Sequence, residues 1–224
     1  MSTVVKVGGS LAAYPEKLRS LCIKLSEISK KQKLLIVPGG GEFADTVRKH
    51  DEKFALSRVV SHRMAILGMD QYGLLLSDLT PNSCAVSSLE DAKKASDSGK
   101  LPVFLPSQLM LNEDPLENSW DVTSDSITVY IAEKAGSGKV VLITDVDGIF
   151  TDDPKNHSAA RLIKALSASE LLDMSKRTSV DKFLPKLLLK TSIECFVING
   201  LFTERVEAVL DGQDTIFTLI KSHK

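Results

Sequence analysis

Short apolar runs alternate with segments of helical periodicity along almost the whole chain, and this rhythm limits the folds open to it. The runs at 3–7, 34–37 and 140–144 have the length and the β-branched content of buried strands. Between the first two, apolar residues recur at helical spacing over 18–28. Strands that alternate with helices form mostly parallel sheets covered on both faces. We therefore predict an α/β fold, a three-layer αβα sandwich around a mostly parallel central sheet.

The same criteria predict the remaining elements. A short helix should begin after Ser167, because Ser167 and Glu170 have the spacing of a capping box. The polar segment 111–120 is expected to be a loop. The other expected strands are 84–86, 103–105, 195–198 and 215–219, and the other expected helices are 42–50, 57–76, 124–134, 181–192 and 204–210.

Composition narrows the class of protein. The 28 basic and 29 acidic residues nearly cancel, so overall charge favours neither nucleic acid nor an anionic membrane as a partner. No apolar stretch approaches the roughly 20 residues of a membrane span. The N-terminus has the pattern of a strand rather than of a signal peptide. Three cysteines lie far apart in apolar surroundings, which indicates buried thiols in a reducing compartment. We expect a cytoplasmic protein.

Two of the apolar runs end in glycines. The first is followed by Gly8-Gly9-Ser10 and contains Lys6, and the second is followed by Gly39-Gly40-Gly41. Glycine lets an anion approach the backbone N–H groups closely, and a lysine adds positive charge. The glycines could serve only as tight turns, and Lys6 could be a solvated edge residue. The combination instead favours a site for two phosphorylated groups that face each other.

Several other sites are excluded by their missing motifs. The chain has neither the P-loop pattern GxxxxGK[ST] nor a GxGxxG after its first strand. It also has no HExxH pattern, and the acidic turn at 144–154 lacks the spacing of an EF-hand. We therefore expect no protein-bound metal ion.

Five motifs do occur in a fixed order, and together they carry a resemblance. They are the segments 6–10, 38–41, 123–126, 144–154 and 183–186. In this order the chain resembles the amino acid kinase family, which includes acetylglutamate, uridylate, isopentenyl phosphate and aspartate kinases. The resemblance implies one domain over 1–224, with an acceptor-binding lobe of about 1–119 and a nucleotide-binding lobe of about 120–224.

A narrower resemblance lies in the segments 62–73, 120–126 and 180–186. They are similar to the branch of the family that phosphorylates [5-(aminomethyl)furan-3-yl]methyl phosphate to a diphosphate in methanofuran biosynthesis. Uridylate kinases and isopentenyl phosphate kinases are the alternatives that share this chemistry. An alternative of another class is a non-catalytic nucleotide sensor or storage protein on the same fold.

The resemblance implies three catalytic residues. Lys6 bridges the transferred phosphoryl group, Asp125 pairs with two lysines, and Lys186 is the second cation. The family pattern Gly-Gly-Met-x-Pro-Lys is Asp-Lys-Phe-Leu-Pro-Lys here, with Asp181 and Lys182 in place of the glycines. This departure leaves Lys182 as an alternative to Lys186.

The resemblance also assigns ATP, with Mg²⁺ held mainly by its phosphates, and a homo-oligomer. Asp45 stands where the isopentenyl phosphate branch usually has a histidine, and a carboxylate there suits an acceptor with an ammonium group. His62 and Trp120 are either structural or part of the acceptor pocket, where Trp120 would cover a furan ring. The residues expected to bind the nucleotide are Gly8, Gly9, Ser10, Thr144, Asp145, Asp147, Gly148, Phe150, Asp153, Pro154 and Lys182. The residues expected to bind the acceptor are Gly39, Gly40, Gly41, Asp45, His62, Trp120, Thr123 and Ser124.

Overall fold

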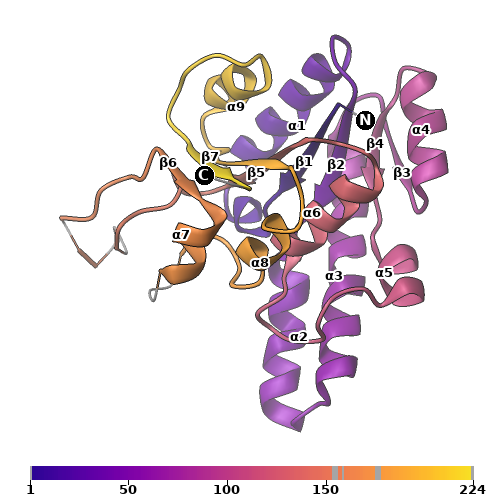
Figure 1. Ribbon diagram of the computed structural model, residues 1–224. Helices are drawn as coiled ribbons and strands as arrows, with labels where there is room; N and C mark the ends of the chain where they lie inside the picture. Colours follow the sequence, from indigo (N-terminus) through magenta and orange to yellow (C-terminus); the bar gives the residue numbers. More distant parts are fainter. Residues whose placement is uncertain (1, 153–155, 158, 175–177, 223–224) are drawn as a thin grey trace.

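The computed structural model describes residues 2–152, 156–157, 159–174 and 178–222 (Figure 1). Within these residues, eight strands form a single sheet in the order β3-β4-β2-β1-β5-β7-β8-β6. The strands are β1 (Thr3–Val7), β2 (Leu34–Pro38), β3 (Ser83–Val86), β4 (Leu101–Phe104), β5 (Lys139–Thr144), β6 (Ala165–Ser167), β7 (Glu194–Asn199) and β8 (Thr218–Lys221). The helices are the 3-10 helix η1 (Gly9–Ala13), α1 (Pro15–Ser29), α2 (Gly41–Phe54), α3 (Arg58–Leu79), α4 (Leu89–Asp97), α5 (Ser107–Glu113), α6 (Ser124–Lys134), α7 (Ala168–Asp173), α8 (Leu184–Leu188) and α9 (Thr203–Leu210).

Strand β1 lies in the middle of the sheet, and this position places the candidate site. It pairs in parallel with β2 on one side and with β5 on the other. The chain therefore leaves β1 toward one half of the sheet and returns later to build the other half. In open α/β sheets, ligands bind outside the carboxyl ends of the strands at such a change of direction.

The two faces of the sheet are covered by different helices. Because side chains alternate along a strand, Val5 and Val7 pack into one core cluster with residues of α1 and α9. Val4 belongs to the cluster on the opposite face, which contains residues of α6, α7 and α8. Lys6 follows the same alternation and extends toward α6. The layers confirm the predicted αβα sandwich, and the pairing of β7 with β8 is antiparallel in an otherwise parallel sheet.

Several predicted boundaries were right and others need correction. Helix α6 and strand β1 have the predicted bounds, and Ser167 and Glu170 form the expected capping box at α7. Helix α8 is much shorter than the predicted 181–192. The side chain of Asp181 accepts the N–H of Leu184 at the start of the helix, and beyond Leu188 the N–H groups of Lys190 and Thr191 bond three residues back.

The last strand is also displaced, since β8 begins at Thr218 rather than at residue 215. Helix α5 extends into the predicted loop 111–120, and α4 and β6 were not predicted. Cys84 is partly exposed, which corrects the expectation of three buried thiols.

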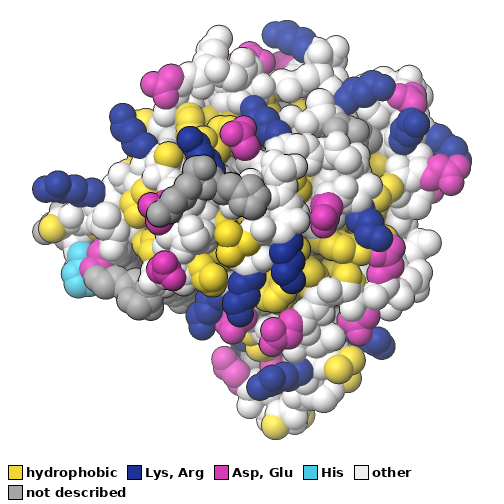
Figure 2. Space-filling view, viewed as in Figure 1, with side chains coloured by type: hydrophobic (Ala, Val, Ile, Leu, Met, Phe, Trp, Pro, Cys, Tyr) yellow, Lys and Arg dark blue, Asp and Glu magenta, His cyan; other side chains and the backbone are white. Residues whose placement is uncertain are grey.

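The surface agrees with the balanced composition. Figure 2 shows positive and negative side chains interspersed over the visible face, with no large region of one sign. No helix among the described residues is long and apolar enough to cross a membrane.

Candidate active site

Lys6 is buried and paired. Its Nζ lies 2.7 Å from Oδ1 of Asp125 at the start of α6, and the two side chains are only 11% and 7% exposed. The interpretation of Lys6 as a solvated edge residue is therefore wrong. The pair joins the central strand to the helix that covers it, across 119 residues of sequence. Since either charge alone would be costly to bury, the two side chains depend on each other.

The two glycine loops touch each other. A Cβ atom on Gly9 would lie only 2.1 Å from the backbone nitrogen of Gly41, so the loops approach as closely as backbones can. Gly41 has a φ of +54°, a left-handed conformation that favours glycine. These two glycines are thus required by the contact between the loops, before any ligand is considered.

The backbone donors of these loops differ from the prediction. The N–H of Gly8 donates to the carbonyl of Ile143 and the N–H of Gly39 donates to the carbonyl of Val7, both at 2.8 Å. The expectation that these two N–H groups donate to phosphates is therefore wrong, because both already donate to backbone carbonyls. The first N–H groups of η1 and α2 remain available, because the N–H groups at the start of a helix have no acceptor within that helix. The N-terminal end of a helix also attracts anions.

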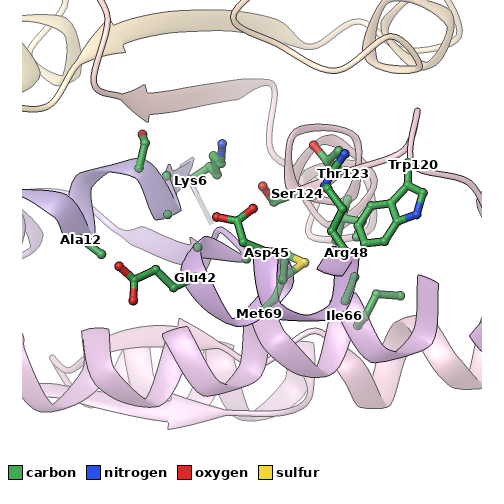
Figure 3. A pocket seen from close by; sticks show the side chains of 18 of the residues that line it. Lys6, Ala12, Glu42, Asp45, Arg48, Ile66, Met69, Trp120, Thr123 and Ser124 are labelled. Atoms are coloured by element: carbon green, nitrogen blue, oxygen red, sulfur yellow. The ribbon is translucent and has the colours of Figure 1, made fainter. Parts of the chain in front are cut away.

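A cavity of about 470 Å³ opens beside this loop contact (Figure 3). Its polar wall comes largely from α2, where Glu42, Asp45 and Arg48 follow one another at helical spacing. In the view of Figure 3, Asp45 lies between Lys6 and Arg48. The predicted site residues that line the cavity are Lys6, Gly8, Gly9, Ser10, Gly40, Gly41, Asp45, His62, Trp120, Thr123 and Ser124, whereas Gly39 does not line it.

Trp120 closes one end of this cavity and is held there by α2. The guanidinium carbon of Arg48 lies 4.3 Å from the centroid of the Trp120 ring, a cation–π contact. The indole N–H donates to Asp51 at 2.6 Å. Sequence reasoning missed Arg48 and Glu42, although both are three residues from Asp45 and so lie on the same side of a helix.

His62 lies on α3 and lines the cavity, with only 7% of its surface exposed. Burial lowers its pKa, while the charge of Asp114 and a hydrogen bond with the backbone of Ser119 act in the opposite direction. The net lowering favours the neutral imidazole.

Asp181 organises the start of α6. Its Oδ2 accepts hydrogen bonds from the N–H groups of Thr123 and Ser126 at 2.9 and 3.0 Å, and it also accepts the hydroxyl of Thr123 at 3.0 Å. The hydroxyl of Ser126 donates to Oδ1 at 2.6 Å. Sequence comparison marked Asp181 as a departure from the family pattern but predicted no role for it.

The same carboxylate also serves α8. Its Oδ1 accepts from the N–H groups of Phe183 at 3.1 Å and Leu184 at 2.8 Å. Burial raises the pKa of Asp181, and the nearby charge of Asp125 raises it further, while the hydrogen bonds from Ser126 and Thr123 oppose this shift.

Lys186 and Lys182 line a second cavity of about 850 Å³ that shares Arg48, Trp120 and Thr123 with the first. Lys182 pairs with Asp121 at 3.2 Å, and its side chain is 80% exposed. The Nζ of Lys186 lies 5.9 Å from the centroid of the Phe183 ring.

Asp125 also lines this second cavity. The expected pairing of Asp125 with two lysines is only half right, because in the described part of the chain its ion pair is with Lys6 alone.

The described residues of the acidic turn after β5 line neither of these two cavities. Thr144 nevertheless lies against Gly8 of the first cavity, and Gly148 accepts a hydrogen bond from Ser179 of the second. Asp147 accepts hydrogen bonds from Arg205 at 2.8 Å and Asn199 at 2.9 Å, so its carboxylate is already engaged. The predicted nucleotide-binding residues that line neither cavity are Thr144, Asp145, Asp147, Gly148 and Phe150. Asp153 and Pro154 lie outside the described residues. Among the described residues, no group of three or more His, Cys, Asp or Glu side chains could hold a metal ion.

The sequence pattern of the amino acid kinase family matches residues 1–199. The chain belongs to the amino acid kinase family. It is 36% identical to the [5-(aminomethyl)furan-3-yl]methyl phosphate kinase of Methanocaldococcus jannaschii, over 97% of this chain and 96% of that protein. It is 27% identical to the uridylate kinase of Pyrococcus abyssi, over 95% of this chain and 96% of that protein.

A solved structure shares the fold of this family member. The uridylate kinase of Archaeoglobus fulgidus superimposes with a TM-score of 0.77 at 21% identity, covering 98% of this chain and all of that one. The predicted family and fold are thus confirmed.

Proposed function

We propose that this family member transfers the γ-phosphoryl group of ATP to a small phosphomonoester and forms a diphosphate. The acceptor we infer is [5-(aminomethyl)furan-3-yl]methyl phosphate. The observation that carries this proposal is the first cavity, which is lined by Lys6 beside the two glycine loops and by two carboxylates of α2, Glu42 and Asp45. Such a cavity suits a ligand that carries both a phosphate and an ammonium group.

The rest of the cavity suits a flat, apolar body between the phosphate and the ammonium group. Ile66 and Met69 of α3 contribute an apolar wall, and Trp120 adds an aromatic one. A plain phosphomonoester such as isopentenyl phosphate would leave Asp45 and Glu42 without a cationic partner. The identity to the furan phosphate kinase along 97% of the chain supports the same acceptor.

Phosphoryl transfer depends on cations that stabilise charge on the transferred group. In the proposed reaction Lys6 supplies this charge at the contact between the two glycine loops, and Asp125 holds Lys6 in place. Lys186 enters from the second cavity as the other cation, with Lys182 as its nearest competitor. The acceptor phosphate is already ionised near neutral pH, so the mechanism needs no general base.

We infer that Mg²⁺ arrives with ATP and is coordinated mainly by its phosphate oxygens, which suits a hard cation. The residues proposed to receive the nucleotide phosphates are Gly9 and Ser10 at the start of η1, beside Lys6. A reaction that consumes ATP fits the expected cytoplasmic location.

The proposal is tested by incubating the purified protein with ATP, Mg²⁺ and one acceptor at a time. The acceptors are [5-(aminomethyl)furan-3-yl]methyl phosphate, UMP and isopentenyl phosphate, and diphosphate products are detected by ³¹P NMR. We expect kcat/KM for the furan phosphate to be at least about tenfold higher than for the other two acceptors. One charge-assisted hydrogen bond between its ammonium group and a carboxylate of the cavity is sufficient for a difference of this size. A preference for UMP or isopentenyl phosphate would assign one of the alternative kinases. ATP binding without any turnover would indicate a sensor or storage protein.

We also propose that the protein forms a homo-oligomer, with a second copy packed on α3. Val60, Leu67 and Leu74 are exposed and follow a seven-residue spacing, with Met64 between them. Only Gln71 interrupts this apolar row along the helix, and two copies can pair along it. Leu67→Glu should shift the mass measured by light scattering from oligomer to monomer. An unchanged mass would place the interface elsewhere.

A further inference from the structure

Asp181 links the two structural elements that carry the proposed catalytic cations. Its carboxylate bonds to the backbone at the start of α6 and at the start of α8. These elements are separated by about 50 residues of sequence and meet at the second cavity. A carboxylate at a helix N-terminus satisfies free N–H groups and interacts favourably with the helix dipole. Here a single carboxylate does this for two helices at once.

The first consequence concerns Lys6. Asp125 lies between Thr123 and Ser126, so both of its flanks are anchored to Asp181 through backbone N–H groups. In return, the backbone N–H of Asp181 donates to Oδ2 of Asp125 at 3.1 Å, while Oδ1 holds Lys6. The direction in which Asp125 holds Lys6 is therefore set from two sides by residue 181.

The second consequence concerns Lys186. Helix α8 begins at Leu184, whose N–H is bonded to Asp181, and Lys186 is two residues further along the same turn. The start of α8 cannot move away from α6 without breaking these bonds. Two acidic side chains, Asp125 and Asp181, are thus kept next to each other although Lys6 pairs with Asp125 and not with Asp181, an arrangement unfavourable for stability alone.

We propose that Asp181 is a positioning residue that fixes the separation of Lys6 and Lys186 across the reacting phosphates. This inference rests on the proposed function, because it assigns the two lysines to one phosphoryl transfer. Phosphoryl transfer needs its cations placed accurately in the transition state, so a loosened separation reduces kcat more than it weakens substrate binding.

The test uses Asp181→Asn, which keeps the shape but loses half of the acceptor capacity, and Asp181→Gly, which restores the family pattern. We expect kcat to fall by at least about tenfold in both variants, with KM for ATP and for the acceptor within about twofold of wild type. In a Lys186→Ala background, either substitution should lower kcat by a smaller factor than it does in the wild-type protein. Without Lys186, the separation between the two cations no longer affects the reaction. Ser88→Ala is the control, since Ser88 caps α4 beside the β3–β4 edge of the sheet and its loss should leave kcat unchanged.

Amide hydrogen exchange provides a readout that does not require turnover. In Asp181→Asn, exchange should accelerate at the amides of both Ser126 and Leu184, whereas in Ser88→Ala neither should change. Acceleration at only one helix, a raised KM with normal kcat, or full additivity with Lys186→Ala would each overturn the inference. If the wild-type protein phosphorylates no acceptor, the proposed function fails, and the exchange data still decide whether Asp181 ties the two helices together.

Discussion

Replacing Lys6 with methionine should damage stability and catalysis by separable amounts. Methionine has nearly the length of lysine but no charge, so Lys6→Met leaves the 7%-exposed side chain of Asp125 without its cation. Removing one partner of a buried ion pair typically costs about 3–5 kcal/mol, and the neighbouring Asp181 carboxylate favours the upper part of that range. Catalysis should lose a further several kcal/mol of transition-state stabilisation, on the order of 10³-fold or more in kcat.

Stability is measured by urea unfolding of Lys6→Met and of the double variant Lys6→Met/Asp125→Asn. The double variant should regain about half or more of the lost free energy of unfolding, because the uncompensated charge is gone, yet it should stay inactive.

Two results would refute this reasoning. Equal free energies of unfolding for the single and double variants would show that the ion pair is not the source of the loss. A kcat near the wild-type value in either variant would remove Lys6 from the reaction.

The remaining predictions concern the acceptor, the second cation and the buried histidine. Asp45→Asn should weaken binding of the amine-bearing acceptor by about 1–3 kcal/mol, measured as a higher KM for that acceptor. KM for ATP and for isopentenyl phosphate should not change. An unaltered KM for the amine-bearing acceptor would contradict the ammonium assignment. Lys186→Ala should lower kcat more than Lys182→Ala, because Lys182 is largely exposed and already paired with Asp121, and the reverse order would exchange their roles. The lowered pKa of His62 means that the unfolded chain binds a proton near pH 6.5 that the folded chain binds only at lower pH, so stability should fall as the pH drops below about 6.5. The free energy of unfolding is measured with urea between pH 7 and 5. In His62→Gln its decrease with falling pH should be less steep by at most about 1.4 kcal/mol per pH unit, and an unchanged slope would show that His62 does not contribute.

Local patterns predicted the parts of this fold that local physics determines. The bounds of β1 could be read directly because its apolar run ends at a glycine pair, and those of α6 because Thr123 precedes its start and Gly136 follows its end. The pairing of Lys6 with Asp125 was implied by the resemblance to the family. By contrast, α4 has a polar sequence in which Ala92 is buried, so it lacks the apolar spacing that marks a core-facing helix, although the Ser88 cap at its start was a readable signal.

What the sequence could not supply were relations between distant segments. Asp181 caps α6 although it lies 55 to 58 residues further along the chain than the residues that it bonds. A sequence motif relates only neighbouring residues, so it could not indicate this contact. The use of the Gly8 and Gly39 N–H groups inside the sheet likewise depends on which strands lie beside β1. Arg48 was within reach, since a helix starting at the glycine loop places it on the same side as Asp45.

The contact between Gly9 and Gly41 has a consequence for how this scaffold can change its substrate. The two loops lie backbone against backbone, and any side chain at position 9 would have to force them apart. The spacing between donor and acceptor phosphates in the proposed reaction is thus a fixed length, set by the radii of backbone atoms and shared by every acceptor. New acceptors can be accommodated only by exchanging side chains along α2 and α3, whose positions leave that spacing untouched. Libraries directed at Glu42, Asp45 and Arg48 should therefore alter acceptor choice while conserving the chemistry of transfer.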